Sequence, residues 1–259
     1  MKPSLIAREL SKDEWLTLAA QAADMGTVKL LITGGEPMLR PDFCEIWEGL
    51  NELGFILELY TNGTLVTPKV METLRRYPPH KIGVTIYGAS AETYGKVCGN
   101  PAMFERALKG FHELLTLPSR FEFRTTIIKD NHADFNELHD LIHREFGPEH
   151  KLIHTVMVNP SVRGACADVN SCRLSPYDSA MLSFERNIKL IKEFYGDAYN
   201  PENLHFEQRD CSTDSVYQPE ASLFGCDAGM KQYTITWDGK MTGCQLLDLF
   251  YTEPLKEGF

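Results

Sequence analysis

Apolar and polar positions alternate along the first 195 residues in blocks that fit strands and helices in turn. The run VKLLIT at 28–33 has few polar positions, and we expect a fully buried strand there. Further short apolar runs predict strands at about 55–63, 81–88, 121–129 and 151–158. Apolar residues at helical spacing predict helices at about 11–26, 41–53, 104–115, 134–147 and 177–195, with another starting at Pro68.

Several predicted helix ends carry residues that satisfy unpaired backbone groups. Ser11 and Glu14 have the spacing of a capping box, in which the serine accepts the Glu14 N–H and the glutamate reaches back. Thr67 precedes Pro68, which fits the first turn of a helix because an N–H is not needed there. Gly26 is placed to end the first helix.

Five strand units with four intervening helices, plus a leading and a trailing helix, indicate parallel strands joined by helical crossovers. Such a sheet is either doubly wound or part of a barrel. We expect a partial (β/α)6 TIM-like barrel, and in both architectures ligands bind at the carboxyl ends of the strands. The residues that follow the predicted strands are Gly34-Gly35-Glu36, Thr61-Asn62-Gly63, Tyr87-Gly88 and Asn159-Pro160.

The remainder of the chain differs from this pattern. Residues 196–222 are polar and rich in turn formers, and we interpret them as a linker that follows a barrel-like domain at 1–195. Asp238-Gly239 lies between two short strand-like runs and predicts a β-hairpin. We therefore expect a small appended module at 223–259.

Composition narrows the function. A net charge of −10 disfavours broad nucleic-acid binding. No run of 18 apolar residues predicts a membrane helix, and the start of the chain lacks the apolar core of a signal peptide, so we expect a cytoplasmic protein without a membrane partner. The seven cysteines are an odd number, which argues against a disulfide framework and leaves burial or metal binding.

The turn Gly34-Gly35-Glu36-Pro37 has two interpretations. It is either an ordinary strand-to-helix turn or a site for an amine-bearing ligand. In the second case, glycines without a Cβ let backbone carbonyls reach an ammonium group, and Glu36 adds a charge-assisted hydrogen bond. The four residues alone do not decide between them.

Three segments together resemble the radical S-adenosylmethionine (radical SAM) superfamily: LLITGGEPMLRPDF, YTNGTL and TIYGASAETYGKVCGNPAMFERAL. More narrowly, they are similar to its peptide- and protein-modifying members with a SPASM extension. The resemblance implies that Gly34, Gly35 and Glu36 hold the amino end of the cofactor's methionine moiety. It also implies cofactor contacts from Thr85 and Asn62.

Arg124 would be the partner of a carboxylate if its side chain points inward, whereas strand arginines more often extend to the end of the sheet. The C-terminal match is a spacing. Cys226, twelve residues, Gly239, four residues and Cys244 fit the opening half of the SPASM pattern, and the resemblance implies that both thiolates bind an auxiliary iron–sulfur cluster. The alternative is two buried cysteines near a hairpin.

The sequence departs from the family at one defining feature. No Cys-x3-Cys-x2-Cys triad for the [4Fe–4S] cluster is present, and the later SPASM cysteines are absent too. We expect a fragment of a longer protein, and the alternative is a short homologue that has lost its clusters. Whether this chain is itself an active enzyme stays open at this point.

The resemblance implies cleavage of S-adenosylmethionine by a reduced [4Fe–4S] cluster, followed by hydrogen abstraction from a peptide or protein side chain. A flavodoxin or ferredoxin would supply electrons. One alternative is a non-redox barrel lyase or hydrolase, for which Lys129 is the one convincing strand-end lysine. The other is a catalytically inactive barrel that binds a peptide.

Some residues are expected to be unremarkable. His139 and His143 are four apart on a helix and fit a solvated face better than a metal site, because no third ligand is evident. Cys166 and Cys172 flank a polar loop and are interpreted as incidental. The aromatic residues expected to pack around the barrel mouth are Tyr87, Tyr94 and Phe104.

Overall fold

The structure is a computed structural model that describes residues 9–158, 168–196, 199–201, 231–244 and 250–259. Its centre is a five-stranded sheet in which neighbouring strands are parallel and follow the chain order, β1-β2-β3-β4-β5. The strands are β1 (Lys29–Ile32), β2 (Ile56–Thr61), β3 (Lys81–Thr85), β4 (Arg120–Thr126) and β5 (Leu152–Thr155). The expected partial TIM-like barrel is confirmed, with five parallel strands in the described part of the chain.

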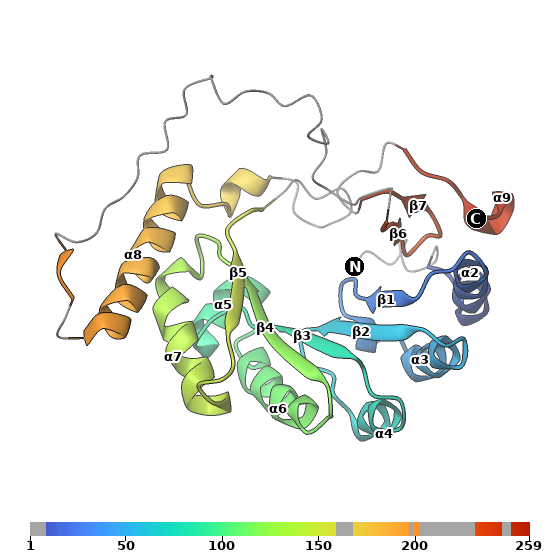
Figure 1. The fold of residues 1–259 in the computed structure, drawn as a ribbon, viewed down its shortest axis with the longest axis horizontal. Helices are drawn as coiled ribbons and strands as arrows, with labels where there is room; N and C mark the ends of the chain where they lie inside the picture. Colours follow the sequence, from blue (N-terminus) through green and yellow to red (C-terminus); the bar gives the residue numbers. More distant parts are fainter. Residues whose placement is uncertain (1–8, 159–167, 197–198, 202–230, 245–249) are drawn as a thin grey trace.

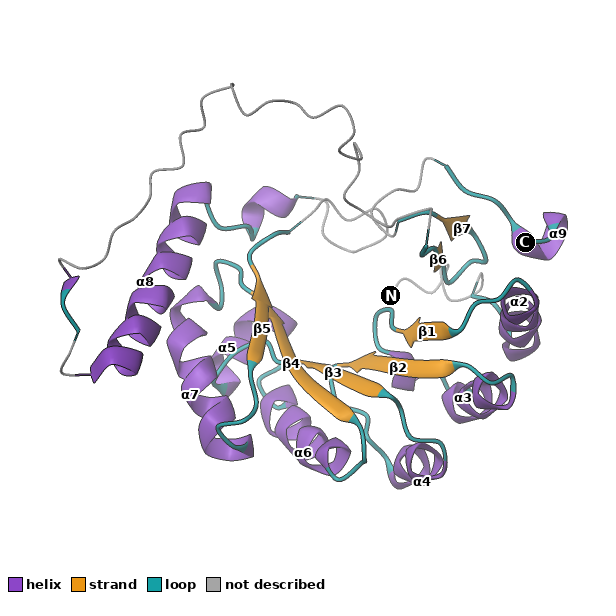
Figure 2. Cartoon of the chain, in the orientation of Figure 1, coloured by secondary structure: helices purple, strands orange, loops and turns teal. Residues whose placement is uncertain are grey.

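Helices lie around the outer side of the curved sheet, and the C-terminal elements lie near β1 (Figures 1 and 2). The α-helices are α2 (Lys12–Asp24), α3 (Phe43–Glu52), α4 (Pro68–Arg76), α5 (Ala91–Cys98), α6 (Met103–Leu115), α7 (Phe135–Phe146), α8 (Pro176–Tyr195) and α9 (Pro254–Glu257). Three short 3-10 turns are η1 (Pro37–Leu39), η2 (His132–Asp134) and η3 (Val169–Ser171).

The predicted caps are confirmed. Glu14 N–H donates to Ser11 Oγ at 3.3 Å, and Ser11 N–H donates to Glu14 Oε2 at 2.8 Å, which completes the capping box of α2. Thr67 accepts the N–H of Val70 ahead of Pro68 at the start of α4. Local sequence therefore sets these helix starts.

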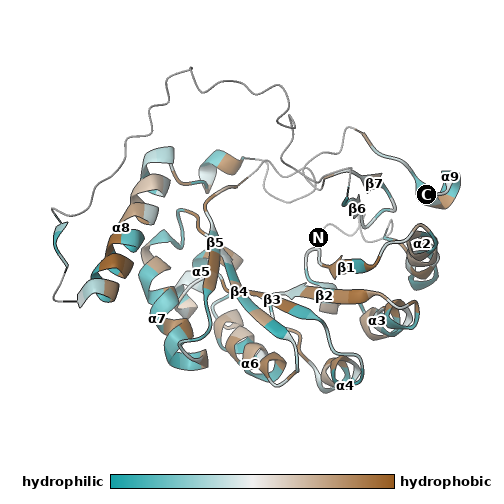
Figure 3. Cartoon of the chain, in the orientation of Figure 1, coloured by the Kyte–Doolittle hydropathy of each residue, from teal (hydrophilic) through white to brown (hydrophobic). Residues whose placement is uncertain are grey.

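The core lies between the sheet and the helices. Alternate residues of the central strands, such as Leu59, Ile82 and Phe123, are fully buried, and Figure 3 shows the apolar colour on β2. The intervening residues, such as Glu58 and Lys81, lie on the inner, concave side of the sheet and carry charge. The alternation separates an apolar outer layer from a polar inner face.

The expectation of a fully buried first strand is wrong. Residues of β1 alternate between exposed and half-buried, and Val28 and Leu31 are 63% and 43% exposed. The physical reason is position, because β1 pairs with β2 on one side and is an edge of the described sheet. The continuous apolar run predicted a strand with another strand on each side, but within the described sheet β1 has β2 as its neighbour on one side alone.

Helix α5 was not predicted. Ser90 caps it through the N–H of Thr93, and Gly99 ends it in the left-handed region at φ 73°. The helix predicted from Pro41 begins two residues later, as α3 at Phe43, and the separate turn η1 precedes it. Both differences involve short elements whose apolar pattern is too brief to define a period.

The predicted hairpin is present. Strands β6 (Thr234–Ile235) and β7 (Met241–Thr242) are antiparallel, and Gly239 adopts φ 83° in the turn. The hairpin contacts the other end of the chain, because Leu10 N–H donates to the Trp237 carbonyl at 3.0 Å. Most of the predicted linker and Asn159-Pro160 lie outside the described residues, so the domain boundaries stay a prediction. Within the described ranges, no helix is long and apolar enough to cross a membrane.

Candidate functional site

The turn after β1 leaves its two glycines open. Gly34 has φ 148°, a conformation that side chains disfavour, so glycine is required there for backbone reasons. A Cβ at Gly34 or Gly35 would find no atom within 4 Å, and both residues are exposed. Their backbones therefore border open space at the carboxyl end of the strand.

Glu36 joins this turn to the end of β2. Its Oε2 accepts the backbone N–H of Asn62 at 2.7 Å, and its Oε1 accepts the Thr61 hydroxyl at 2.8 Å. Oε1 also accepts the N–H of Met38 at 3.1 Å, which caps η1. The carboxylate thus uses three of its acceptor positions to hold two loops together, and the glycine backbones are left to meet a ligand.

The partners of Glu36 are neutral. Burial raises the pKa of Glu36 above its ordinary value, although the hydrogen bonds from Asn62, Thr61 and Met38 each act to lower it. Carboxylates surrounded by donors but without a counter-charge remain costly to ionise when they leave water.

Asn62 lies in the same loop as the Glu36 partners. Its Oδ1 accepts the N–H and the hydroxyl of Thr64, at 2.9 and 2.6 Å, so the side chain shapes the turn. Within the described residues its Nδ2 has no hydrogen-bond partner, and this amide is the part of Asn62 that is available to a ligand. Gly63 follows at φ 70°, with the ring of Phe111 in the space where a Cβ would lie.

A second polar side chain ties together the loops after β3 and β4. Asn131 is 1% exposed, and its Nδ2 donates to the carbonyls of Tyr87 and Thr126 at 2.9 and 3.0 Å. Its Oδ1 accepts the N–H of Ile128 at 2.7 Å. Asp134 adds a hydrogen bond from the N–H of Ala89 at 2.7 Å. We call the carboxyl-end loops held by Glu36, Asn131 and Asp134 the rim.

The aromatic residues at the rim pack as expected. Tyr87 and Tyr94 meet edge to face with ring centroids 5.8 Å apart, and Tyr94 meets Phe104 at 5.3 Å. Burial raises the pKa of the Tyr87 phenol, and Cys98 and Glu36 add smaller effects in the same direction. The effect of the Glu36 charge on the pKa of Tyr87 indicates that Tyr87 lies near the Gly-Gly-Glu turn.

Thr85 and Arg124 lie side by side on the concave face, because they are register partners on β3 and β4. Arg124 Nη1 is 3.2 Å from Glu122 Oε2, and its guanidinium carbon is 4.7 Å from the centroid of the Tyr60 ring. The Arg124 side chain therefore lies over the concave face and does not extend to the end of the sheet. This inward orientation is required if Arg124 is to bind a carboxylate. The pair has no direct hydrogen bond to the Gly-Gly-Glu group within the described residues.

Charged residues cross the concave face nearer the amino ends of the strands. Glu58 lies 3.3 Å from Lys29 and 3.2 Å from Lys81, and Lys81 lies 3.8 Å from Glu122. Burial acts to raise the pKa of Glu58, but the hydrogen bonds of Lys81 and Lys29 outweigh it and hold the pKa below its ordinary value. We call this row, with Arg124 at its end, the floor.

Apart from Arg124, the floor was missed by sequence analysis, as were the Asn131 and Asp134 contacts. Glu58 and Lys81 each lie inside a run assigned to a strand, and the polar position in each was the available signal. Their meeting depends on strand register, in which Glu58 lies beside Lys81. An alternation of charge on successive strands would have indicated the row only once the sheet order was known.

The predicted cysteine ligands are not brought together in the described chain. Cys226 lies outside the described residues, and Cys244 follows β7 at a half-buried position. Among the residues that the structure describes, no group of three or more His, Cys, Asp or Glu is arranged to hold a metal ion. The auxiliary cluster therefore stays a prediction.

Among the other candidates, Lys129 lies in the rim loop after β4, and His139 lies on α7, outside the rim. Lys129 Nζ donates to the Asn170 carbonyl at 2.8 Å, and Cys172 contacts the Val169 carbonyl, while Cys166 lies outside the described residues. The assignment of His139 to a solvated face is wrong, since it packs edge to face on Phe135. Burial, followed by the charge of Arg186, lowers the pKa of His139 to about 4.

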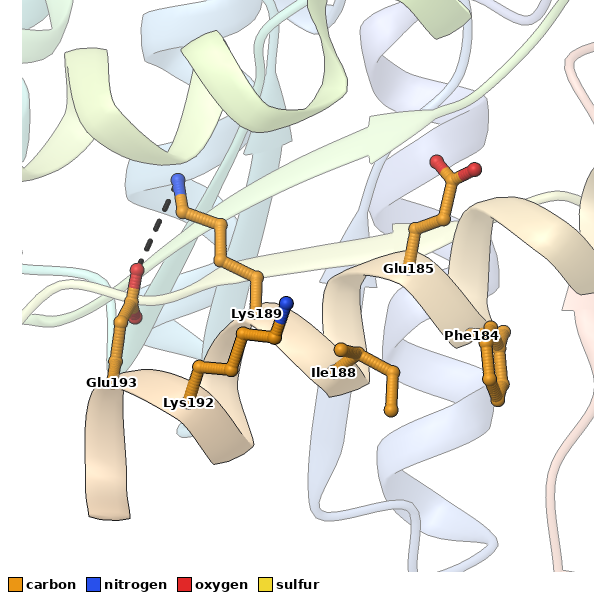
Figure 4. Close-up of a pocket in the computed structure, with 6 residues that line it drawn as sticks. All are labelled: Phe184, Glu185, Ile188, Lys189, Lys192 and Glu193. Carbon is orange, nitrogen blue, oxygen red and sulfur yellow. Dashed lines mark ion pairs between the residues drawn. The ribbon is translucent and has the colours of Figure 1, made fainter. Parts of the chain in front are cut away.

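A hollow of about 410 Å³ lies along α8 (Figure 4). It is lined by Phe184, Glu185, Ile188, Lys189, Lys192 and Glu193. All six come from one helix, and none belongs to the rim or the floor. We place the candidate site at the rim and not at this hollow, because the open Gly34-Gly35 turn and the polar side chains that hold the loops meet there.

Known proteins are similar to this chain in sequence. The AdoMet-dependent heme synthase of Methanosarcina barkeri is 35% identical over 175 residues, which are 68% of this chain and 48% of that protein. The PqqA peptide cyclase of Rhizobium meliloti is 35% identical over 100 residues, 39% of this chain and 27% of that protein. The chain spans about half the length, or less, of the heme synthases it matches.

Solved structures share the fold. SuiB of Streptococcus suis superposes with a TM-score of 0.64 at 15% identity, over 96% of this chain and 58% of that one. The enzyme anSMEcpe with bound AdoMet gives a TM-score of 0.61 at 17% identity, over 93% and 67%. At these identities the likeness shows a shared fold.

A model of the radical SAM superfamily matches residues 3–142, which is more than half of the chain. This segment contains the Gly34-Gly35-Glu36 turn, the loop with Asn62, and strands β1 to β4 with Thr85 and Arg124. The match covers the residues that form the rim and the floor, and the chain belongs to the radical SAM superfamily.

Proposed function

We propose that this half barrel binds S-adenosylmethionine at its rim, as part of an enzyme that modifies a peptide or protein side chain. The observation that carries the proposal is the Gly34-Gly35 turn, held open by Glu36 against the end of β2. The backbone carbonyls of this turn accept hydrogen bonds from the cofactor's ammonium group, and Asn62 Nδ2 lies in the adjoining loop. Arg124 and Thr85 bind the carboxylate of the same methionine moiety.

The residues present fit the cofactor in chemistry. An ammonium group needs acceptors, which exposed glycine carbonyls offer, and a carboxylate needs donors, which a guanidinium offers. Arg124 uses one N–H on Glu122, and its other donors have no hydrogen-bond partner within the described residues. When bound, S-adenosylmethionine supplies the 5′-deoxyadenosyl group with which this superfamily abstracts hydrogen.

The chain does not fit the [4Fe–4S] cluster that family membership implies. Its seven cysteines include no Cys-x3-Cys-x2-Cys triad. We therefore derive no step through a cluster for these 259 residues. What they supply is the binding and orientation of the cofactor.

Cofactor binding is tested by calorimetric titration of the chain with S-adenosylmethionine. Gly35→Val places a side chain where no atom lies within 4 Å, so folding should be unaffected while binding weakens at least about tenfold. Met25→Val, at an exposed position near the amino end of β1, is the matched control. Equal affinity of Gly35→Val and wild type would remove the turn from the site.

Support for a peptide substrate comes from relatives. The PqqA peptide cyclase is a sequence relative, and SuiB bound to the precursor peptide SuiA shares the fold with a TM-score of 0.64. A second candidate is a tetrapyrrole, because the heme synthase match extends over more of the chain than the peptide cyclase match. An absorbance titration with Fe-coproporphyrin III separates them. A saturable shift of the main absorption band would favour the tetrapyrrole, and no shift keeps the peptide.

A further inference from the structure

Arg124 is fixed from two sides on the concave face. One side of its guanidinium lies over the Tyr60 ring, with 4.7 Å between the guanidinium carbon and the ring centroid. Its Nη1 donates to Glu122 Oε2 at 3.2 Å. The Arg124 side chain is nevertheless 35% exposed, so part of the guanidinium faces the open interior.

The space for this arrangement comes from Gly83. Tyr60 and Glu122 are its register partners on β2 and β4, so Gly83 lies between them. A Cβ at Gly83 would lie 2.7 Å from two carbons of the Tyr60 ring and 3.0 Å from Arg124 Cδ. Gly83 is not among the residues with positive φ, so the backbone tolerates other residues and the reason for glycine is space.

This arrangement has a consequence for binding. An arginine side chain has many rotamers, and a ligand that selects one of them loses affinity through ordering. Stacking on an aromatic ring and pairing with a carboxylate order the guanidinium before the ligand arrives. Glu122 also pairs with Lys81, whose Nζ lies 3.8 Å from Glu122 Oε2. The negative charge of Glu122 is therefore divided between two cations and does not fully neutralise Arg124.

We propose that Tyr60, Gly83 and Glu122 are positioning residues that preset the Arg124 guanidinium for the carboxylate of S-adenosylmethionine. The proposal rests on the proposed function, because it takes Arg124 to be the carboxylate partner. Tyr60 supplies a surface, Gly83 supplies the room and Glu122 sets the rotation of the guanidinium. None of the three needs to touch the cofactor.

The test uses two ligands that differ in the carboxylate alone. The chain is titrated with S-adenosylmethionine and with decarboxylated S-adenosylmethionine, and the ratio of the two dissociation constants is recorded for each variant. Charge-assisted hydrogen bonds predict a preference of about 10- to 100-fold for the carboxylate-bearing ligand in wild type. Arg124→Ala should abolish this preference. If Arg124→Ala leaves the ratio unchanged, the role of Arg124 in the proposed function fails.

The positioning residues are tested by graded variants. Tyr60→Leu should lower the ratio about three- to tenfold, whereas Tyr60→Phe, which keeps the ring, should leave it unchanged. Gly83→Ala should act like Tyr60→Leu, with Gly95→Ala as its control because a Cβ at Gly95 meets nothing closer than 3.7 Å. Glu122→Gln should lower the ratio by about threefold.

Two outcomes separate the ideas. A ratio that falls in Arg124→Ala but stays at the wild-type value in Tyr60→Leu would overturn the positioning proposal and leave the proposed function intact. Equal weakening of both ligands in Tyr60→Leu would also overturn it, because a merely structural change does not discriminate by carboxylate. Should Gly83→Ala fail to fold, Tyr60→Leu and Glu122→Gln still decide the matter.

Discussion

Glu36 at the rim and Glu58 at the floor are both glutamates, but their surroundings differ. Both are removed from water and both accept several hydrogen bonds. The partners of Glu36 are backbone N–H groups and a hydroxyl, whereas those of Glu58 are the ammonium groups of Lys29 and Lys81. The pKa of Glu36 is raised by burial, and that of Glu58 is lowered by its two lysines against the effect of burial.

The difference shows that the charge of the partners, more than their number, decides the direction of a buried pKa. It also suits the two places. At the rim, neutral partners hold the loops and introduce no charge of their own next to the ligand. At the floor, opposite charges form a row of ion pairs across the strands. The following changes would break or sharpen this contrast.

The largest expected effect is at the rim. Asn131→Ala removes three hydrogen bonds from a side chain that is 1% exposed and leaves buried backbone groups of two loops unpaired. We expect a loss of about 3 kcal/mol in the free energy of unfolding, measured by urea denaturation. Asn51→Ala, which loses one hydrogen bond to the Trp47 carbonyl, is the control and should cost under about 1 kcal/mol. Equal losses would show that the rim is not specially held.

The next effect is at the floor. Glu58→Gln removes the charge between Lys29 and Lys81, and we expect a loss of about 1–2 kcal/mol at pH 7. Because the folded pKa of Glu58 is lowered, its contribution is fully present above the ordinary value of 4.5 and is lost as pH falls through the folded pKa. Denaturation curves of wild type and variant should therefore converge in acid. A constant difference across pH would contradict the ion-pair explanation.

Glu36→Gln should show the opposite pH dependence and a smaller effect. The folded pKa of Glu36 is raised, so its protonated form is favoured by folding, and wild-type stability from this group falls as pH rises from 4.5 through the folded pKa. Glutamine resembles the protonated form, but its amide nitrogen leaves one of the three donors to Glu36 unpaired, so the variant should lose about 1 kcal/mol relative to wild type at pH 7. Relative to wild type, the variant should gain stability with rising pH. A gain with falling pH would reverse our assignment of Glu36.

The smallest effect is expected at the outer end of the floor. The Lys29 side chain is 57% exposed, and Glu58 keeps Lys81 when Lys29 is removed. Lys29→Met should cost under about 0.5 kcal/mol, and this cost should shrink with added salt, because salt screens an ion pair whose lysine is exposed. A loss as large as that of Glu58→Gln would mean that both lysines are needed to hold the carboxylate.

Local sequence signals predicted the structure correctly where the physics is local. The capping box of Ser11 and Glu14, the Thr67-Pro68 helix start and the Asp238-Gly239 turn all depend on residues a few positions apart. The fold class followed as well, because alternating strands and helices leave few ways to arrange a sheet. The family resemblance identified the Gly-Gly-Glu turn.

Contacts between distant residues could not be predicted. The partners of Glu36 lie 25 and 26 residues further on, and Asn131 meets the carbonyl of Tyr87 across 44 residues. The floor depends on the register of four strands, and the exposure of β1 depends on which strands flank it. Sequence pattern defines which face a residue takes, but not which side chain stands opposite.

The hydrogen bond between Leu10 and Trp237 has a consequence for synthesis on the ribosome. Its two residues are 227 positions apart (237 − 10), so at about 5–20 residues per second the second one is made roughly 10–45 seconds after the first. During that interval the nascent chain holds the β1 side of the sheet without its hairpin. Chaperones that bind emerging chains would find a target there in Leu10, which is 7% exposed once the chain is complete and lacks its hairpin partner until then.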